Sequence, residues 1–217
     1  MPPHPSTDPN GAPQGPNRDH LWEEAALALA GTWEIARRDP KALERFGTDA
    51  DAFWRSFGAI FFTIPFFVFM LTAEWRMLGE LNLAGEVAPL AYTIAQTVSY
   101  VLGWAAFPLA MIPFLRLVNA QSAYAPFIIV YNWSNVLVIA VMSAPFLLYS
   151  FGVLPSEGVG FFMLLLLVAS LVYRFEVARR ALNVQAGVAM AVVAVDFFLS
   201  LLLSAFTEQM LPIASGA

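Results

Sequence analysis

The chain has 217 residues, of which 59% are hydrophobic and 12% are charged, and its formal net charge at pH 7 is −5. Soluble domains carry about 25% charged and about 45–50% apolar residues, so this composition indicates a membrane protein. The acidic balance argues against a nucleic-acid partner, and the lack of cysteine excludes disulfides, thiolate metal sites and cysteine nucleophiles.

The N-terminal region is polar and rich in proline. Residues 1–19 hold six of the fifteen prolines, with Gly, Asn, Ser and Asp between them, and no apolar stretch follows directly. This composition predicts a disordered tail and not a signal peptide. Both histidines, His4 and His20, lie in this polar region, so we expect no metal site and no haem or other cofactor.

Residues 20–47 are predicted to form a cytoplasmic, amphipathic helical segment. In its first helix, which we expect to reach Arg38, charged side chains gather on one face and an apolar face carries Trp22 and Trp33. A helix of this kind suits the membrane interface, where we expect these tryptophans, Arg37 and Arg38 to lie. The same pattern is typical of a helix packed on the protein's own cytosolic surface.

Two further helix starts precede the first apolar stretch. Asp39-Pro40 begins a short helix that Gly47 ends. Thr48 to Asp51 resembles a capping box. It predicts a helix that continues without a break into the apolar sequence.

Residues 48–217 contain five apolar stretches that are each long enough to cross a membrane. A hydrocarbon core of about 30 Å takes roughly 20 helical residues to cross. The predicted spans lie near residues 56–74, 90–115, 124–152, 159–175 and 184–206. Pro126 and Pro145 are expected to bend the long third span or to shorten its ends. The predicted fold is an all-α membrane protein with five transmembrane helices.

The basic residues are distributed unequally about these spans. Ten of the eleven fall on the N-terminal side of the predicted topology: Arg18, Arg37, Arg38, Lys41, Arg45, Arg55, Arg116, Arg174, Arg179 and Arg180. The opposite side carries Arg76 with Glu74, Glu80, Glu86, Glu157 and Glu208. Because basic loops stay inside, the N-terminus is predicted to be cytoplasmic and the C-terminus periplasmic, in a multi-pass protein of a bacterial inner membrane.

The cytoplasmic arginines have two interpretations. A surface that binds anionic lipid at the membrane interface typically carries such a group of basic residues. Here it would consist of Arg37, Arg38, Arg174, Arg179 and Arg180. The simpler interpretation is that these residues determine topology and have no other role.

Five polar residues are predicted to lie near the middle of the bilayer. The fifth span carries Asp196, the third Asn132 and Asn135, and the second Gln96 and Ser99, all at similar depth by the helical rise. We expect Asp196 to face the interior and to meet Asn132 or Asn135, with Gln96 nearby. No Lys or Arg is expected at that depth, so burial should disfavour the ionised form of Asp196.

This polar cluster supports two hypotheses. A carboxyl group beside two amides is able to bind a proton, a cation or a polar solute. Alternatively, interhelical hydrogen bonds simply fasten the spans together, at about 0.6–2 kcal/mol each. The sequence offers only one acid inside the predicted spans, which favours the structural interpretation.

The sequence contains no G-x-S-x-G, P-loop, Gly-rich dinucleotide or H-E-x-x-H motif, and no span is predicted to contain a pair of acids. We therefore expect a non-enzymatic protein. The leading hypothesis is a membrane scaffold or accessory subunit of a membrane complex, whose partners are the lipid bilayer and other membrane subunits. The alternative is a small permease or an ion or proton pathway centred on Asp196. An enzyme that acts on lipid is the third.

The span layout and a bent third span with Tyr131-Asn132-Trp133 resemble the Yip1-like family of integral membrane proteins. The stretch from Gly31 through Asp39-Pro40 to Phe53-Trp54-Arg55-Ser56-Phe57 also resembles uncharacterised bacterial members of alphaproteobacterial type. The resemblance covers about residues 20–206 and implies five spans. The short cytosolic hallmark of the eukaryotic members is absent, so their trafficking role and small-GTPase partners are not implied here.

Overall fold

The computed structural model describes residues 18–80 and 88–211, and the side chains of residues 18–21 are not described. The predicted tail therefore lies almost wholly outside the described residues, as does Glu86. Within the described parts the chain forms helices and no strand. The helices are α1 (Arg18–Ala36), η1 (Ala42–Arg45), α2 (Ala50–Ser56), α3 (Ala59–Glu80), α4 (Pro89–Leu117), η2 (Gln121–Ala123), α5 (Tyr124–Met142), α6 (Ala144–Ser150), α7 (Ser156–Ala181) and α8 (Ala186–Met210).

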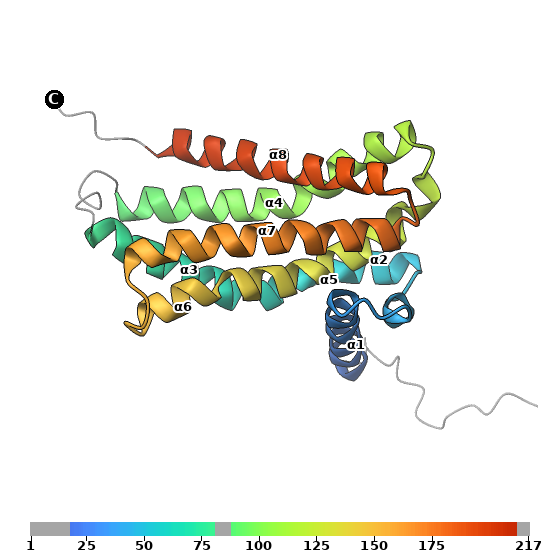
Figure 1. Cartoon of the computed structure of the whole chain (residues 1–217), viewed down its shortest axis with the longest axis horizontal. Helices are drawn as coiled ribbons and strands as arrows, with labels where there is room; N and C mark the ends of the chain where they lie inside the picture. The colour runs from blue at the N-terminus through green and yellow to red at the C-terminus, as the bar shows by residue number, and fades with distance from the viewer. Residues whose placement is uncertain (1–17, 81–87, 212–217) are drawn as a thin grey trace, which may run out of the picture.

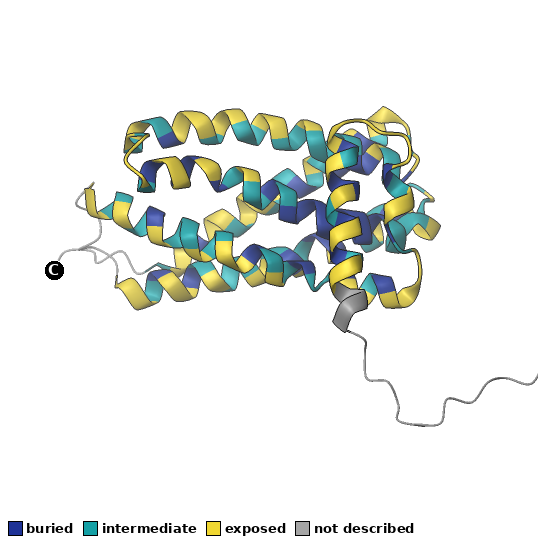
Figure 2. Ribbon diagram, turned by 90° about the horizontal axis from the view of Figure 1, so that it is seen from below, coloured by how far each residue is buried: buried dark blue, intermediate teal, exposed yellow. Residues whose placement is uncertain are grey.

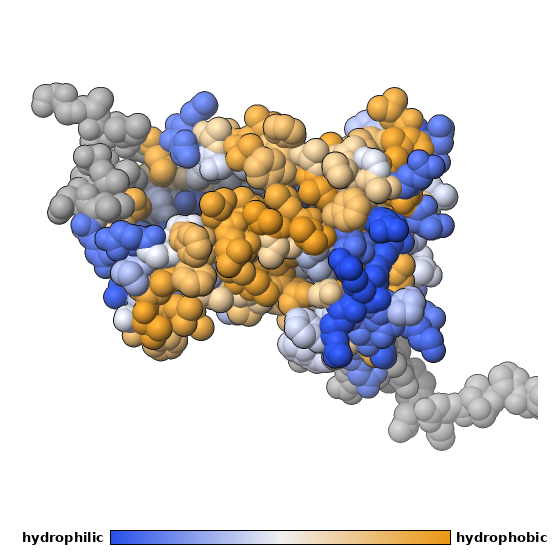
Figure 3. All heavy atoms as spheres, viewed as in Figure 1, coloured by the Kyte–Doolittle hydropathy of each residue, from blue (hydrophilic) through white to orange (hydrophobic). Residues whose placement is uncertain are grey.

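Five helical segments are long and apolar enough to cross a membrane, as the sequence predicts. They are Ala50–Glu80, Pro89–Leu117, Gln121–Ser150, Ser156–Ala181 and Ala186–Met210. The long helices run side by side along the bundle (Figure 1). The surface seen in Figure 3 has a broad apolar band with hydrophilic residues toward both ends, the pattern of a protein embedded in a bilayer. These features indicate a multi-pass membrane protein.

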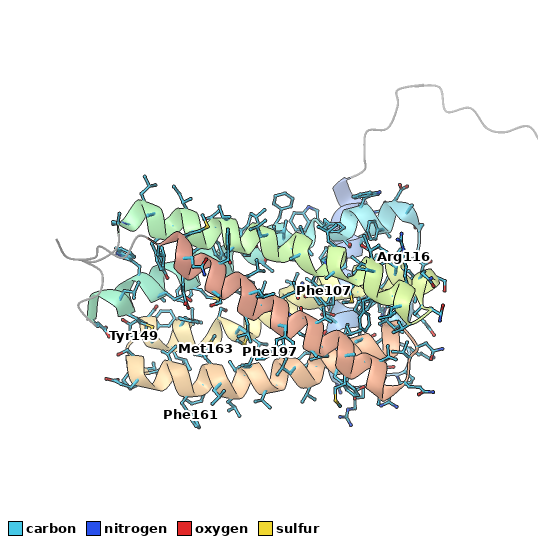
Figure 4. The ribbon with its side chains drawn as sticks, turned by 90° about the horizontal axis from the view of Figure 1, so that it is seen from above. Phe107, Arg116, Tyr149, Phe161, Met163 and Phe197 are labelled. Atoms are coloured by element: carbon cyan, nitrogen blue, oxygen red, sulfur yellow. The ribbon has the colours of Figure 1, made fainter. Side chains whose placement is uncertain are left out.

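The bundle has two ends, the α1 end and the far end. At the α1 end, α3 begins at Ala59, α4 ends at Leu117 and α7 ends at Ala181. At the far end, α3 ends at Glu80 and α7 begins at Ser156. Figure 4 labels Arg116 toward the α1 end and Tyr149 at the far end.

Two of the spanning helices are longer than their apolar stretches. α3 continues to Glu80, past the predicted end near residue 74, and α7 continues to Ala181, past the predicted end near residue 175. The reason is that Glu and Arg are good helix formers, so a charged residue ends an apolar stretch without ending the helix. As a result, Glu74 and Arg174 lie inside spanning helices, and their predicted positions in loops are wrong.

The third span is the core of the bundle. Every residue of α5 from Phe127 to Val136 is buried, because α3, α4, α7, α1 and α2 all pack against this helix. The buried residues of the bundle gather near the helix α1 that crosses it (Figure 2). Helix α5 ends at Met142, and Pro145 lies in the first turn of α6, so the third span is interrupted next to this proline.

Helix α1 crosses the bundle and packs on it through small residues. Ala25, Ala28, Thr32 and Ile35 are buried at helical spacing, and α1 contacts α5 and α7. The exposed face keeps Trp22, whose side chain is 66% exposed. This packing matches the second of the two interpretations of the segment, in which the helix rests on the protein's own surface.

The connection from α1 to α3 departs from the prediction of one continuous helix. The side chain of Asp49, not Thr48, caps α2 by accepting a hydrogen bond from the Ala52 amide at 2.6 Å. Helix α2 ends at Ser56, and two residues separate it from α3. Ion pairs hold this region together, with Arg55 Nε 2.6 Å from Glu24 Oε2 on α1.

Candidate functional site

A cavity of about 330 Å³ lies among α3, α4, α5, α7 and α8. Four of the five residues predicted to gather in the membrane line it: Gln96, Ser99, Asn135 and Asp196. The wall also contains the hydroxyl groups of Tyr100 and Ser200, from the same two spans as Gln96 and Asp196, and three residues that were not predicted to belong to the cluster: Glu74, Tyr131 and Arg174. The structure therefore brings most of the predicted cluster together and adds a second acid and a base.

Asp196 forms an ion pair with Arg174 in the wall of this cavity. Its Oδ2 lies 3.1 Å from Arg174 Nη1, and its Oδ1 accepts a hydrogen bond from the Tyr131 hydroxyl at 2.6 Å. Arg174 Nη2 donates to Asn135 Oδ1 at 2.9 Å, and the guanidinium lies 5.1 Å from the centre of the Tyr131 ring. The expectation that no Lys or Arg lies at the depth of Asp196 is therefore wrong.

The directions of α7 and α8 explain how this ion pair forms. Side chains on a helix lean toward its N-terminus. Helix α7 begins at the far end, so Arg174 leans away from the α1 end and deeper into the membrane. Helix α8 begins at the α1 end, so Asp196 leans toward Arg174. The two Cα atoms lie about 10 Å and about 15 Å from the α1 ends of their helices, and the side chains close that difference.

One feature of the sequence is consistent with the inward position of Arg174. Arg174 lies between Tyr173 and Phe175, more than one helical turn before Arg179 and Arg180. Its position, two residues before Glu176, is at the end of the apolar stretch and not in the basic group that follows. The long arginine side chain lets its charge lie several ångströms from its Cα, which a count of loop charges does not detect.

Asn132 does not take part in the cluster. It is fully buried, its Nδ2 donates to Ser56 Oγ at 2.9 Å, and its Oδ1 has no hydrogen-bond partner among the described residues. The face of α5 that meets α7 and α8 carries Tyr131 and Asn135, which are four residues apart and therefore aligned. Asn132 lies to one side of that face and joins α5 to α2.

Glu74 is the second acid of the cavity. Its Oε2 accepts a hydrogen bond from the buried Tyr92 hydroxyl at 2.9 Å. No ion pair of the described residues includes it, because Arg76 lies 5.6 Å from the ring of Tyr149 on another side of α3. The expectation that the spans hold a single acid is wrong, since Glu74 and Asp196 line one cavity.

Aromatic rings supply much of the remaining wall. Phe67 stacks on Tyr100 with ring centres 4.3 Å apart, and Phe107 stacks on Tyr131 at 4.0 Å. Phe107 lies between the two ends of the bundle (Figure 4). Trp104 completes this lining. The cavity therefore combines a few charged groups with rigid aromatic walls, which is a common composition of binding sites.

The residues predicted for the membrane interface lie at the α1 end, and two of them, Arg38 and Arg180, form ion pairs within the protein. Arg180 Nε lies 3.3 Å from Glu176, and its Nη1 donates to the Asp39 carbonyl at 3.0 Å. Arg38 Nη2 lies 3.8 Å from the same Glu176. These contacts hold the end of α1 on α7. The side chains of Trp22, Trp33, Arg37 and Arg179 are exposed there.

Among the described residues no group of three or more His, Cys, Asp or Glu is positioned to hold a metal ion. No family model matches the chain, and no curated protein or solved structure matches it. The resemblance to the Yip1-like family therefore stays a prediction.

Proposed function

We propose that this chain is a multi-pass membrane protein that provides a pathway for an ion, a proton or a small charged solute through the cavity around Asp196. The observation that carries the proposal is the cavity itself, with two acids and a base in its wall. Ionisable residues within a membrane are costly and usually line a substrate or ion pathway.

The alternative role of the cluster is to fasten the helices, and it explains less. An interhelical hydrogen bond contributes only about 0.6–2 kcal/mol, and a buried ion pair is weak support for stability because its desolvation costs so much. Fastening requires contact between the partners and no open space beside them. Here the ion pair borders a cavity of about 330 Å³, which leaves room for a bound solute.

The position of the cavity along the bundle supports a pathway. Measured from the far end by helical rise, Glu74 lies at about 9 Å, Gln96 at about 10 Å, Asp196 at about 21 Å and Arg174 at about 27 Å. The polar lining thus extends over most of a hydrocarbon core of about 30 Å. Toward the α1 end the bundle is closed by a buried apolar layer of Met111, Leu115, Phe127 and Ile128. With the N-terminus in the cytoplasm, the cavity belongs to the periplasmic side of an inner-membrane protein.

Flux through reconstituted vesicles tests the proposal. We expect Asp196→Asn combined with Arg174→Gln to abolish flux of protons and monovalent cations, because the double variant removes both charges from the cavity wall and keeps an uncharged polar group at each position. The matched control is Thr207→Val in α8, a buried residue outside the cavity wall. Unchanged flux in a correctly folded double variant would contradict a pathway at this site.

The scaffold hypothesis remains the second candidate because one surface feature favours it. An apolar groove of about 920 Å³ runs between α1 and α3, lined by Trp22, Trp54, Phe61 and Trp133 among others. Aromatic grooves of this size are typical of surfaces that bind another membrane component. Crosslinking from a photoreactive residue placed at Trp54 in native membranes tests it. A single stoichiometric adduct with another subunit supports a scaffold, and adducts with lipid alone contradict it.

A further inference from the structure

The charges in the cavity wall do not cancel. Arg174 and Asp196 neutralise one another at 3.1 Å, whereas Glu74 has no cationic partner among the described residues. The nearest base along the chain, Arg76, contacts Tyr149 away from the cavity. An ionised Glu74 therefore leaves one negative charge in a membrane-embedded space, which favours a positively charged occupant.

Glu74 also has one oxygen available. Tyr92 occupies Oε2, and Oε1 accepts no hydrogen bond from the described residues. A carboxylate accepts several hydrogen bonds, and those from a charged N–H donor are about twice as strong as neutral ones. Gln96 and Ser99 lie in the same part of the wall and offer further polar contacts.

The surfaces next to Glu74 are aromatic. Phe67 lies two helical turns before Glu74 on α3, so both face the same side of the helix, and Phe67 stacks on Tyr100 at 4.3 Å. The faces of aromatic rings attract cations, most strongly where water is excluded. The cavity already holds one such contact, between the Arg174 guanidinium and the ring of Tyr131 at 5.1 Å.

The size and chemistry of the wall select among cations. A volume of about 330 Å³ is at the small end of ligand pockets. Hard inorganic cations such as Ca²⁺ and Mg²⁺ require a shell of oxygen ligands. The wall near Glu74 offers one carboxylate and the neutral oxygens of Gln96, Ser99 and Tyr100, and the rest of it consists of rings and apolar side chains. That composition suits a cation with an apolar surface.

We propose that the cavity binds a small organic cation, an alkylammonium or quaternary ammonium ion, with its charged nitrogen between Glu74 and the rings of Phe67 and Tyr100. This site rests on the pathway proposed above, since it lies in the same cavity and names the class of solute that enters it.

Binding of radiolabelled tetramethylammonium to the full chain in lipid nanodiscs tests this site. We expect saturable binding that Glu74→Gln weakens by about tenfold or more, because the amide keeps the shape and the Tyr92 contact but loses the charge. The control is Glu80→Gln, an acid of the same helix whose Oε1 accepts a hydrogen bond from Tyr149 at 2.6 Å outside the cavity. This control should bind like the unmodified chain. Tert-butanol, a neutral compound of similar shape, should not compete.

The outcomes separate this site from the pathway. Equal loss in both Glu variants, or competition by the neutral compound, overturns the organic-cation site. Proton or Na⁺ flux that depends on Asp196, without any tetramethylammonium binding, also overturns it and leaves the pathway standing. Saturable binding that depends on Glu74, without flux of any ion, supports the site and contradicts the pathway. Circular dichroism and gel filtration of each variant confirm that the compared proteins are folded.

Discussion

The ion pair between Arg174 and Asp196 predicts a strong interaction between two substitutions. Both side chains are largely buried, with exposed fractions of 19% and 11%, and their charged atoms lie 3.1 Å apart. Removing one partner of a buried pair leaves the other charge uncompensated and costs about 3–5 kcal/mol. Arg174 keeps Asn135 and the Tyr131 ring as partners in Asp196→Asn, so we expect about 3 kcal/mol for this variant.

The double variant should be far less damaging than the sum of the single ones. It leaves no uncompensated charge in the buried site, and such a charge is the main cost of each single variant. We expect Arg174→Gln with Asp196→Asn to cost about 1 kcal/mol or less, and a coupling energy above about 2 kcal/mol. The free energy of unfolding, measured by SDS titration in mixed micelles for all four proteins, gives this coupling directly.

Tyr131→Phe serves as the control for the same site. It removes the hydroxyl that donates to Asp196 at 2.6 Å and keeps the ring beneath Arg174, so its cost should be that of one hydrogen bond to a charged group, about 1.5–3 kcal/mol. Additive effects of Arg174→Gln and Asp196→Asn would refute the reasoning, because they would mean that the two charges do not stabilise one another in the folded protein.

Three further predictions concern the surroundings of the site and the topology. In the same SDS titration, Asn135→Leu should destabilise the fold by about 1–3 kcal/mol more than Asn132→Leu. Asn135→Leu removes a hydrogen-bond partner of Arg174, whereas the Oδ1 of Asn132 has no partner to lose among the described residues. Gly31→Ala should loosen the packing of α1, because the new Cβ would lie 2.7 Å from Cε2 of the Phe46 ring. Limited proteolysis should then cleave α1 faster, and an unchanged cleavage rate would contradict this. The chain has no cysteine, so Lys41→Cys and Glu157→Cys should label with an impermeant maleimide from opposite sides of the membrane, and labelling from one side would contradict the topology.

The direction of each span, rather than its composition alone, decides which polar residues meet. The sequence predicts the depth of Asp196 and Asn135 correctly enough to place both in one cavity wall. It predicts the wrong partner because side chains lean along their helices. Arg174 starts nearer the α1 end than Asp196 and still reaches it. Depth counted along a helix therefore predicts which residues belong to the site, but it does not predict which of them contact one another.

The acid at Glu74 was missed for a related reason. It follows an apolar stretch directly and precedes Arg76, which makes it look like the start of a charged loop. Helix α3 continues for six residues beyond it, and the packing of α4 brings Tyr92 to its carboxylate. The sequence of one helix does not indicate which of its faces will be covered by a neighbour. The inward orientation of Glu74 is therefore visible only once α4 is packed against α3.

The sequence alone determined the all-helical fold, the five spans and the region of the membrane where polar groups collect. These follow from apolar length and helical periodicity, which are local properties that hold whatever the chain packs against. Tertiary structure decided the ion pair of Arg174 with Asp196, the separation of Asn132 from the cluster, the second acid at Glu74 and the space between them. Each depends on how helices distant in sequence are rotated and aligned, and that rotation is set by the packing of the whole bundle.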